Sequence, residues 1–301
     1  MPVIGADPWR HQFFEHVPGP PDVLIPVKDY DAWTMYPEHR WVFDKLAIFL
    51  SQGIPAAPHG VMPPSFPVFS KPMINLRGMG AGSRVIATEA EYRDTLIPDH
   101  IWCELLTGPH VSTDVAVIDG NPVWWRHSTG TPGPQGTFDH WHVHAEPNPA
   151  IEEWVGNWAR THLRGYTGLI NTETIGARII EAHLRFADQW PDLNGPGWVE
   201  AVIDLYAYQR WTYQDAGRRD GYSVVLFGPH GRRYRHPPAE LVEEVRAMPE
   251  ISSVQITFHE DRDPSTHPMP PGGFRLATIN AWSLDAGRDA RARLAEALLA
   301  P

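Results

Sequence analysis

Two acidic residues in an alternating segment, Glu173 and Glu181, are the first candidates for chemistry in this sequence. The alternation over residues 168–185 predicts two strands joined near Gly176, and the side chains of a strand point to its two faces in turn. A three-residue turn over 176–178 would place Glu173 opposite Glu181 on one face. Two carboxylates in such positions repel each other unless one is protonated or a cation lies between them. Because oxygen ligands suit Mg²⁺ and Mn²⁺, the pair predicts a divalent-metal site.

The strand that carries Glu181 also carries His183 and Arg185 on the same face. The pairing that joins the two acids would place Asn171 opposite His183. A second interpretation stays open at this point, namely a solvated polar face on which Arg178 and Arg185 neutralise the carboxylates.

A glycine-rich loop follows the predicted strand 66–70 and contains Gly78, Gly80 and Gly82. Alternate glycines let backbone N–H groups approach an anion closely, and Lys71 at the strand end adds positive charge. The loop lacks the ending of a Walker A motif and the spacing of a Rossmann loop. It therefore predicts either a phosphate-binding segment or a flexible turn.

The segment from Trp102 to His110 begins in an apolar predicted strand and ends in a turn. The free backbone groups at such a strand end can hold a flat base. The alternative is an ordinary strand and turn.

Three histidines, His140, His142 and His144, share one face of another predicted strand. Their spacing is suitable for Zn²⁺ or another transition metal. The alternatives are neutral imidazoles packed among aromatic residues, or a wall that faces a substrate.

The composition limits the function classes. The chain has 301 residues, of which 42% are hydrophobic, and this is enough for one or two packed cores. The formal charge of −11 argues against nucleic-acid binding. No apolar run reaches the roughly 18 residues of a membrane span, and we expect no secretion signal. The single cysteine, Cys103, suits the cytoplasm.

Lysine is rare in the chain. Only Lys28, Lys45 and Lys71 occur among the 25 basic residues. Either these lysines are placed for their compact charge, or the chain has a general preference for arginine.

Strands and helices alternate along the sequence, which predicts an α+β fold. The expected helices cover 36–52, 89–96, 152–164, 198–211 and 284–299. The expected strands cover 23–27, 66–70, 85–87, 101–106, 111–118, 122–126, 222–227, 253–258 and 274–281, besides the strand pair within 166–185. We expect a loop over 128–137 and a boundary within 215–221, before a small α+β unit.

The segment Asp44-Lys45-Leu46, followed by Gln52-Gly53-Ile54-Pro55, is similar to a "DK … GIP" motif. The segment Glu181-Ala182-His183-Leu184-Arg185 is similar to "E-x-N-x-R". These motifs, in order with the glycine loop and the acidic pair, resemble the ATP-grasp superfamily over about residues 36–301. The closest likeness is to biotin-dependent carboxylases and the large subunit of carbamoyl phosphate synthetase.

This resemblance implies an α+β ATP-grasp fold, in which two α+β subdomains clamp a nucleotide. The implied domains are a truncated N-terminal segment over 1–35, an ATP-grasp domain over 36–215 and a carboxylase-like C-terminal α+β domain over 216–301.

The resemblance also implies a binding site for ATP. Two lysines and a glycine-rich flap would hold the phosphates, a strand end would bind the adenine, and a histidine would bind the ribose. These residues are Lys45, Lys71, Gly78, Gly80, Gly82, Ser83, Glu104, Leu105, Leu106 and His110.

The implied metal ligands are Glu173, Glu181 and His183, and the implied catalytic residues are Arg185, which faces the transferred phosphate, and Lys71. His183 stands where the family has asparagine. Since imidazole binds Mg²⁺ poorly and Mn²⁺ better, the expected ion is Mg²⁺ or Mn²⁺. The hairpin is shorter than in the carboxylases, and the N-terminal domain is nearly absent. Biotin carboxylation is not expected, because no biotin-attachment segment is visible.

The function implied is an ATP-dependent carboxylate–amine ligase that works through an acyl phosphate and releases ADP and phosphate. The expected partners are small-molecule carboxylates and amines, without nucleic acid or membrane, and a homodimer is one expected assembly. Candidate walls of the acceptor site are Arg126, His127, His140, His142 and Arg178. The alternatives are an ATP-binding sensor or scaffold without ligase activity, and a His-rich metalloenzyme.

Overall fold

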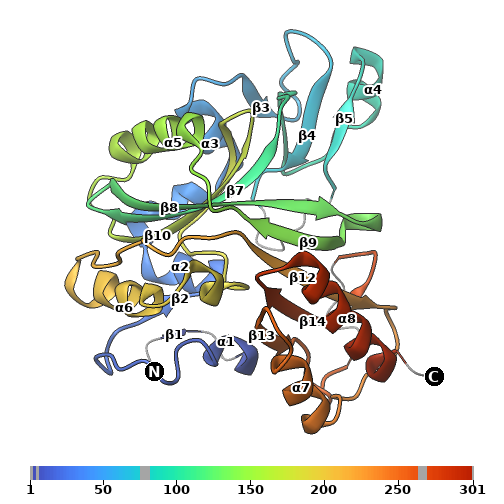
Figure 1. Cartoon of the computed structure of the whole chain (residues 1–301). Coiled ribbons are helices and arrows are strands. Elements are labelled where there is room, and N and C mark those ends of the chain that lie inside the picture. Colours follow the sequence, from blue (N-terminus) through green and yellow to red (C-terminus); the bar gives the residue numbers. More distant parts are fainter. Residues whose placement is uncertain (1–2, 5–6, 75–81, 264–269, 300–301) are drawn as a thin grey trace. The chain divides into compact units, whose positions relative to one another are not determined.

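The computed structural model describes residues 3–4, 7–74, 82–263 and 270–299 (Figure 1). Contacts divide the chain into two compact units whose segments alternate along the sequence. We call Pro26–Trp125 with Asn148–Phe186 the hairpin unit, and Met1–Ile25 with Arg126–Pro147 and Ala187–Pro301 the C-terminal unit. The domain boundaries expected after residues 35 and 215 stay a prediction.

The hairpin unit contains two sheets. In one, the strands lie in the order β11, β10, β7 and the first part of β8, and in the other the order is β3, β6, β4, β5. The strands are β3 (Ala56–Pro58), β4 (Val68–Pro72), β5 (Arg84–Ile86), β6 (His100–Glu104), β7 (His110–Ile118), β8 (Asn121–Pro132), β10 (Gly168–Ile175) and β11 (Arg178–His183). The helices are α2 (Asp29–Met35), η1 (Pro37–Phe43, a 3₁₀ helix), α3 (Lys45–Ser51), α4 (Glu89–Asp94) and α5 (Pro149–His162).

The apolar stripe of α5 forms the main core of this unit. Ile151, Val155 and Trp158 recur at helical spacing and are buried. They belong to one cluster with buried sheet residues such as Val115 and Ile170. Both α3 and α5 contact β11, so the strand with the second acid is supported by two helices.

The helix expected over 36–52 is wrong as a single element, because the chain breaks at Asp44. The Asp44 carboxylate accepts hydrogen bonds from the backbone N–H groups of Leu46 and Ala47, at 2.8 and 3.3 Å. An aspartate in this position caps a new helix and satisfies N–H groups that have no partner inside it. Lys45 is therefore the first residue of α3.

The β10–β11 hairpin has the predicted pairing but a different turn. Glu173 pairs with Glu181, and Asn171 pairs with His183, as expected. The three-residue turn is wrong: Ile175 pairs with Arg178 across a two-residue turn. A bulge at Ile180 then shifts the register by one residue, which brings the two acids opposite each other.

The C-terminal unit is built on an antiparallel sheet. The remainder of β8 is followed in the sheet by β9 (Phe138–Val143), β12 (Gly221–Gly228), β14 (Phe274–Ala281) and β13 (Ile251–Ile256). Its helices are α1 (Pro8–His11), η2 (Pro134–Gly136, 3₁₀), η3 (Pro191–Asn194, 3₁₀), α6 (Trp198–Tyr208), α7 (Ala239–Arg246) and α8 (Leu284–Leu298). The unit also contains β1 (Val3–Ile4), and β2 (Ile25–Pro26) lies where the units meet along the chain.

The core of the C-terminal unit lies between its sheet and the helices α7 and α8. Buried residues from β13, β14 and α8 form one cluster that includes Val254, Ile279 and Leu294. The expected strand 274–281 and the closing helix are confirmed. The loop expected over 128–137 is wrong for its first half, because β8 continues to Pro132 and pairs with β9.

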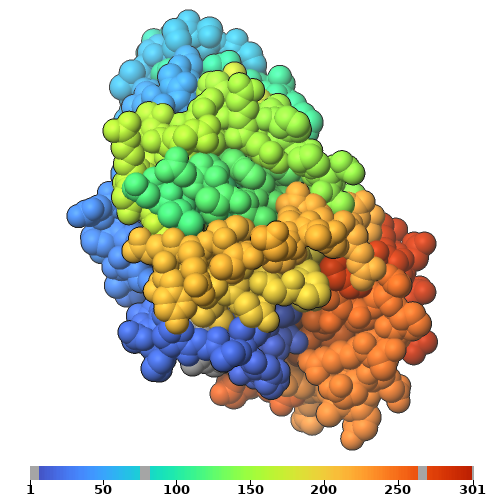
Figure 2. Space-filling view, turned by 60° about the vertical axis from the view of Figure 1, so that its left-hand side comes forward, coloured from blue at the N-terminus to red at the C-terminus, as the bar shows by residue number. Residues whose placement is uncertain are grey.

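The N-terminal segment is held to this unit by Arg10. Its guanidinium donates hydrogen bonds to the carboxylate of Asp188, at 2.6 Å, and to the side-chain oxygen of Gln255. In Figure 2 the dark-blue N-terminal residues lie against gold and orange residues of the same unit. Across the described part of the chain, no helix combines the length and the apolar character needed to cross a membrane.

Candidate functional site

The acidic pair of the hairpin is compensated by a buried lysine at the start of α3. The Lys45 Nζ lies 3.2 Å from the Glu181 Oε2, and only 4% of the Lys45 side chain is exposed. The backbone N–H of Lys45 donates to the carbonyl of Met73, at 2.9 Å, which fixes this helix start beside the end of β4. The ammonium therefore has a defined position relative to Glu181.

A second lysine reaches the same hairpin from β4. The Lys71 Nζ donates a 2.7 Å hydrogen bond to the carbonyl oxygen of Ile180, the bulged residue. It also lies 4.5 Å from the centre of the Phe49 ring. Burial lowers the pKa of Lys71 to about 8; Cys103 opposes this shift, and the charge of Lys45 adds to it. Two of the three lysines thus converge on one strand.

The first acid is paired with a histidine. The His110 Nε2 lies 3.2 Å from the Glu173 Oε2. This hydrogen bond raises the pKa of His110 above its usual range, although burial opposes the shift. Burial alone would raise the pKa of Glu173, but the hydrogen bond and the charge of His110 lower it. Glu173 is therefore a carboxylate at neutral pH.

Asp29, which the sequence analysis missed, connects His183 with Arg185. Its Oδ1 lies 3.0 Å from the His183 Nδ1 and accepts a hydrogen bond from the Arg185 Nε, also at 3.0 Å. Burial raises the pKa of Asp29, but Arg185 and His183 lower it well below its usual range. Asp29 lies at the start of α2, 154 residues before His183, and no motif marks it.

These contacts fit a divalent-metal site. Glu173, Glu181 and His183 each offer one ligand atom within 4.8 Å of the others. Since Asp29 lies against the Nδ1 of His183, the Nε2 faces Glu181, at 3.7 Å. A carboxylate that orients a ligating imidazole in this way is common at metal sites. The two carboxylates suit Mg²⁺ or Mn²⁺, and the imidazole shifts the preference towards Mn²⁺.

The segment expected to bind adenine lies against the tip of the hairpin. Gly108 has a φ of +123°, and a Cβ at this residue would lie 2.8 Å from the Cα of Gly176. A Cβ on Gly176, whose φ is +55°, would lie 2.5 Å from the carbonyl oxygen of Thr107. Only glycine fits both positions. This contact fixes the segment beside the hairpin, and the sequence analysis did not anticipate it.

The other predicted nucleotide residues are placed as follows. Glu104 ends β6, Leu105 and Leu106 follow it, and Leu106 packs against a small core with Ile101 and Cys103. Gly82 and Ser83 directly precede β5. Gly78 and Gly80 lie outside the described residues.

The predicted acceptor residues fall in both units. Arg126, His127, His140 and His142 belong to the C-terminal unit. Arg178 belongs to the hairpin unit, where its guanidinium carbon lies 3.5 Å from the centre of the Trp154 ring.

Arg126 is 2% exposed, and its Nη2 donates to the carbonyl oxygens of Leu193 and Arg219, at 3.1 and 2.7 Å. Burial and the charge of Arg218 lower its pKa to about 10, so it stays charged at neutral pH.

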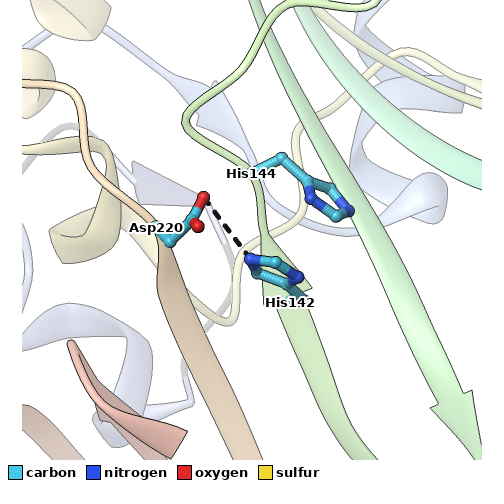
Figure 3. A group of neighbouring side chains, drawn as sticks. All are labelled: His142, His144 and Asp220. Carbon is cyan, nitrogen blue, oxygen red and sulfur yellow. Dashed lines mark ion pairs between the residues drawn. The ribbon is translucent and has the colours of Figure 1, made fainter.

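The three histidines of the predicted strand face have different polar partners. His142 and His144 lie together, with ring centres 4.0 Å apart, and Asp220 faces His142 (Figure 3). His140 pairs instead with Asp139, at 2.9 Å between its Nδ1 and a carboxylate oxygen. Burial and the charge of His142 lower the pKa of His144 to about 4, so its ring is neutral at pH 7. No motif in the sequence marks Asp220. It directly precedes β12 and lies 76 residues after His144, so the sequence does not link the two.

No protein-family model and no curated protein matches the sequence. Solved structures do match the fold. An L-amino acid ligase from Bacillus licheniformis superposes with a TM-score of 0.60 at 13% identity, over 96% of this chain and 82% of that one. A phosphoribosylamine–glycine ligase from Thermotoga maritima gives 0.61 at 14% identity, over 96% and 85%. An N5-carboxyaminoimidazole ribonucleotide synthetase from Thermus thermophilus gives 0.58 at 14% identity, over 93% and 83%. The predicted α+β fold is therefore confirmed.

Proposed function

We propose that this chain, which has the fold of the ATP-grasp superfamily, is an ATP-dependent ligase that joins a carboxylate to an amine. The observation that carries the proposal is the convergence of the two buried ammonium groups, Lys45 and Lys71, on β11. In this strand Glu181 pairs with Glu173 of β10. Such a group of fixed charges is suited to a polyphosphate and its metal ions. Two of the similar structures are named as an L-amino acid ligase and a phosphoribosylamine–glycine ligase. Both names denote ligases whose substrates carry an amino group, which supports C–N bond formation.

The lysines bind the phosphates of ATP in this proposal. Both side chains are almost fully buried. The Lys45 ammonium lies beside the Glu181 carboxylate and the Lys71 ammonium donates to the carbonyl of Ile180, so the positions of the two charges change little when the ligand binds. Prearranged charge of this kind stabilises a transition state without reorganisation. The lowered pKa of Lys71, about 8, still leaves it mostly protonated at pH 7.

The residues that hold the metal are Glu173, Glu181 and His183. When bound, Mg²⁺ or Mn²⁺ supplies positive charge to the phosphate oxygens. The chain contributes charged neighbours for both carboxylates. Lys45 neutralises Glu181, and His110 lowers the pKa of Glu173.

Arg185 acts on the transferred phosphate, and Asp29 is a positioning residue for it. Asp29 holds the Arg185 Nε at 3.0 Å, whereas the outer guanidinium nitrogens make longer contacts, at 3.3 Å to the carbonyl of Phe186 and 3.5 Å to Asp29. These weaker contacts can be exchanged for phosphate oxygens. Arg185 stabilises the charge that develops as an oxygen of the substrate carboxylate attacks the γ-phosphorus. The bond from that phosphorus to the β–γ bridging oxygen breaks, and ADP leaves.

The second step forms the product bond. The amine nitrogen attacks the carbon of the acyl phosphate, the bond from that carbon to the phosphate oxygen breaks, inorganic phosphate leaves, and the nitrogen loses a proton. Water must be kept away from the acyl phosphate, and we assign this task to the glycine-rich segment with Gly78, Gly80, Gly82 and Ser83, of which the first two glycines lie outside the described residues. The adenine-binding role of Glu104 to Leu106, the ribose-binding role of His110 and a homodimeric assembly stay predictions. So do the acceptor residues Arg126, His127, His140, His142 and Arg178.

The test is a trap for the acyl phosphate. Purified protein is incubated with ATP, either Mg²⁺ or Mn²⁺, a panel of carboxylates, and hydroxylamine as the amine. We expect ADP release and hydroxamate formation with at least one carboxylate, and a loss of about 100-fold or more in Glu181→Gln. Glu153→Gln, an exposed residue of α5 in the same unit, is the matched control and should leave turnover unchanged.

A second candidate function is ATP binding without ligation, as in a sensor or scaffold. His183, which stands where the family has asparagine and which Asp29 holds, favours this candidate. Tight ATP binding with no ADP release, for any carboxylate and with either ion, would overturn the ligase proposal in its favour.

A further inference from the structure

A second group of metal-ligand side chains lies in the C-terminal unit. His142 is in β9, His144 follows that strand, and Asp220 precedes β12. Tyr222 pairs with His142 and Gly221 with Val143, so the register of the two strands brings Asp220 beside His144. One ligand atom from each of the three residues lies within 4.8 Å of the other two (Figure 3).

Each of the three side chains is held in place by a neighbour. The Asp220 Oδ1 accepts a 2.7 Å hydrogen bond from the backbone N–H of Ala145. The His144 Nε2 lies 2.8 Å from the Thr129 Oγ1. When one ring nitrogen of a histidine contacts a neighbour in this way, the other ring nitrogen points away from that neighbour, as at many metal sites.

His142 is held by stacking. Its ring lies 4.7 Å from the ring of Tyr222, with an angle of 17° between the planes. The His142 Nε2 is inaccessible to solvent, and its contact with the Asp220 Oδ1, at 3.4 Å, is long for a hydrogen bond. A buried polar nitrogen of this kind is costly unless something binds it.

We propose that His142, His144 and Asp220 form a Zn²⁺ site. Two imidazole nitrogens and one carboxylate oxygen are a ligand set that Zn²⁺ prefers over Mg²⁺, and three protein ligands leave a fourth position for water or another ligand. The positive charge of Arg126 acts on His144 and opposes a cation bound there. The Asp220 carboxylate supplies compensating negative charge. The site is argued from these side chains alone and does not depend on the ligase proposal.

The experiment uses the full-length protein after removal of metal with a chelator. Zn²⁺ is titrated by calorimetry, and Co²⁺ is added separately, because Co²⁺ in a tetrahedral nitrogen and oxygen site absorbs visible light strongly. We expect one strong Zn²⁺ equivalent and a visible Co²⁺ spectrum. His142→Gln, His144→Gln and Asp220→Asn should each weaken Zn²⁺ binding about tenfold or more. Asp220→Asn keeps the oxygen that accepts from Ala145, so it should stay folded, which the thermal midpoint of the metal-free variant checks.

Two controls separate this site from other places where Zn²⁺ can bind. Glu181→Gln disables the hairpin site and should retain the Zn²⁺ equivalent and the Co²⁺ spectrum. His140→Gln, on the same strand but paired with Asp139, should also retain them. No Zn²⁺ binding by the wild type overturns the proposal. So does Zn²⁺ binding that survives in His142→Gln and His144→Gln, or that disappears in Glu181→Gln.

Discussion

Lys71→Met tests whether the buried ammonium is kept for a ligand at the expense of stability. Burial lowers the pKa of Lys71 from 10.5 to about 8, which corresponds to about 3 kcal/mol of destabilisation at pH 7. Methionine has a similar shape and no charge, so it removes this term. It also removes the hydrogen bond to the carbonyl of Ile180, which is worth about 1.5–3 kcal/mol because the donor is charged. The two terms nearly cancel at pH 7, so the decisive quantity is the pH dependence.

The sign of that dependence follows from proton binding. Between pH 8 and pH 10.5 the folded wild type has lost the proton of Lys71 while the unfolded chain still carries it, so the wild type gains stability as the pH rises. The variant lacks this gain. The difference in unfolding free energy, variant minus wild type, should therefore fall by about 2–3 kcal/mol from pH 7 to pH 10.

The assay is urea unfolding of both proteins at pH 7, 8, 9 and 10, together with ATP binding at pH 7. Lys28→Met is the control, because Lys28 is exposed and its replacement should change stability by less than about 0.5 kcal/mol at every pH. ATP binding should weaken in Lys71→Met alone. A free-energy difference that stays constant from pH 7 to pH 10 would show that the folded protein does not destabilise this ammonium, and the reasoning would fail.

Three further variants test other contacts of the hairpin unit, by urea unfolding and by turnover. Asp29→Asn should lower the free energy of unfolding by about 1–3 kcal/mol at pH 7, and by less as the pH falls below 4. The reason is that folding lowers the pKa of Asp29, so its carboxylate stabilises the fold above the pKa that it has in the unfolded chain. Turnover of this variant should fall more than its ATP affinity. Gly176→Ala should cost about 2–3 kcal/mol because its Cβ would meet a carbonyl oxygen at 2.5 Å, whereas Gly165→Ala, with positive φ but open space, should cost about 1 kcal/mol; equal losses would contradict the contact with the nucleotide segment. Gln52→Ala should cost about 2–3 kcal/mol, because it leaves a backbone N–H of β11 and an indole N–H of α5 without their acceptor; a loss under about 0.5 kcal/mol would refute this.

Local patterns in the sequence were sufficient for the elements that carry one clear period. The hairpin, the strand 274–281 and the closing helix lie where the sequence predicts them. The break at Asp44 was missed, since an apolar stripe runs through it, and only the capping bonds reveal that the helix restarts.

Contacts between distant segments could not be predicted in the same way. Asp29 and Asp220 are single acidic residues in segments with no motif, and their histidine partners, His183 and His142, lie 154 and 78 residues away. The approach of Gly108 to Gly176 also depends on how two turns meet in space. For the candidate site, the sequence therefore supplied the lysines and the acids, and tertiary packing supplied the residues that orient them.

The bulged residue Ile180 makes two properties of the hairpin independent of each other, namely the pairing of the two acids and the anchoring of Lys71. A hairpin shortened by this one residue would still oppose Glu173 and Glu181 in an uninterrupted ladder, but it would no longer present a spare peptide oxygen to Lys71. The pairing of Glu173 with Glu181 and the anchoring of Lys71 therefore depend on different residues of the same hairpin. Each can be altered by mutation while the other is left intact.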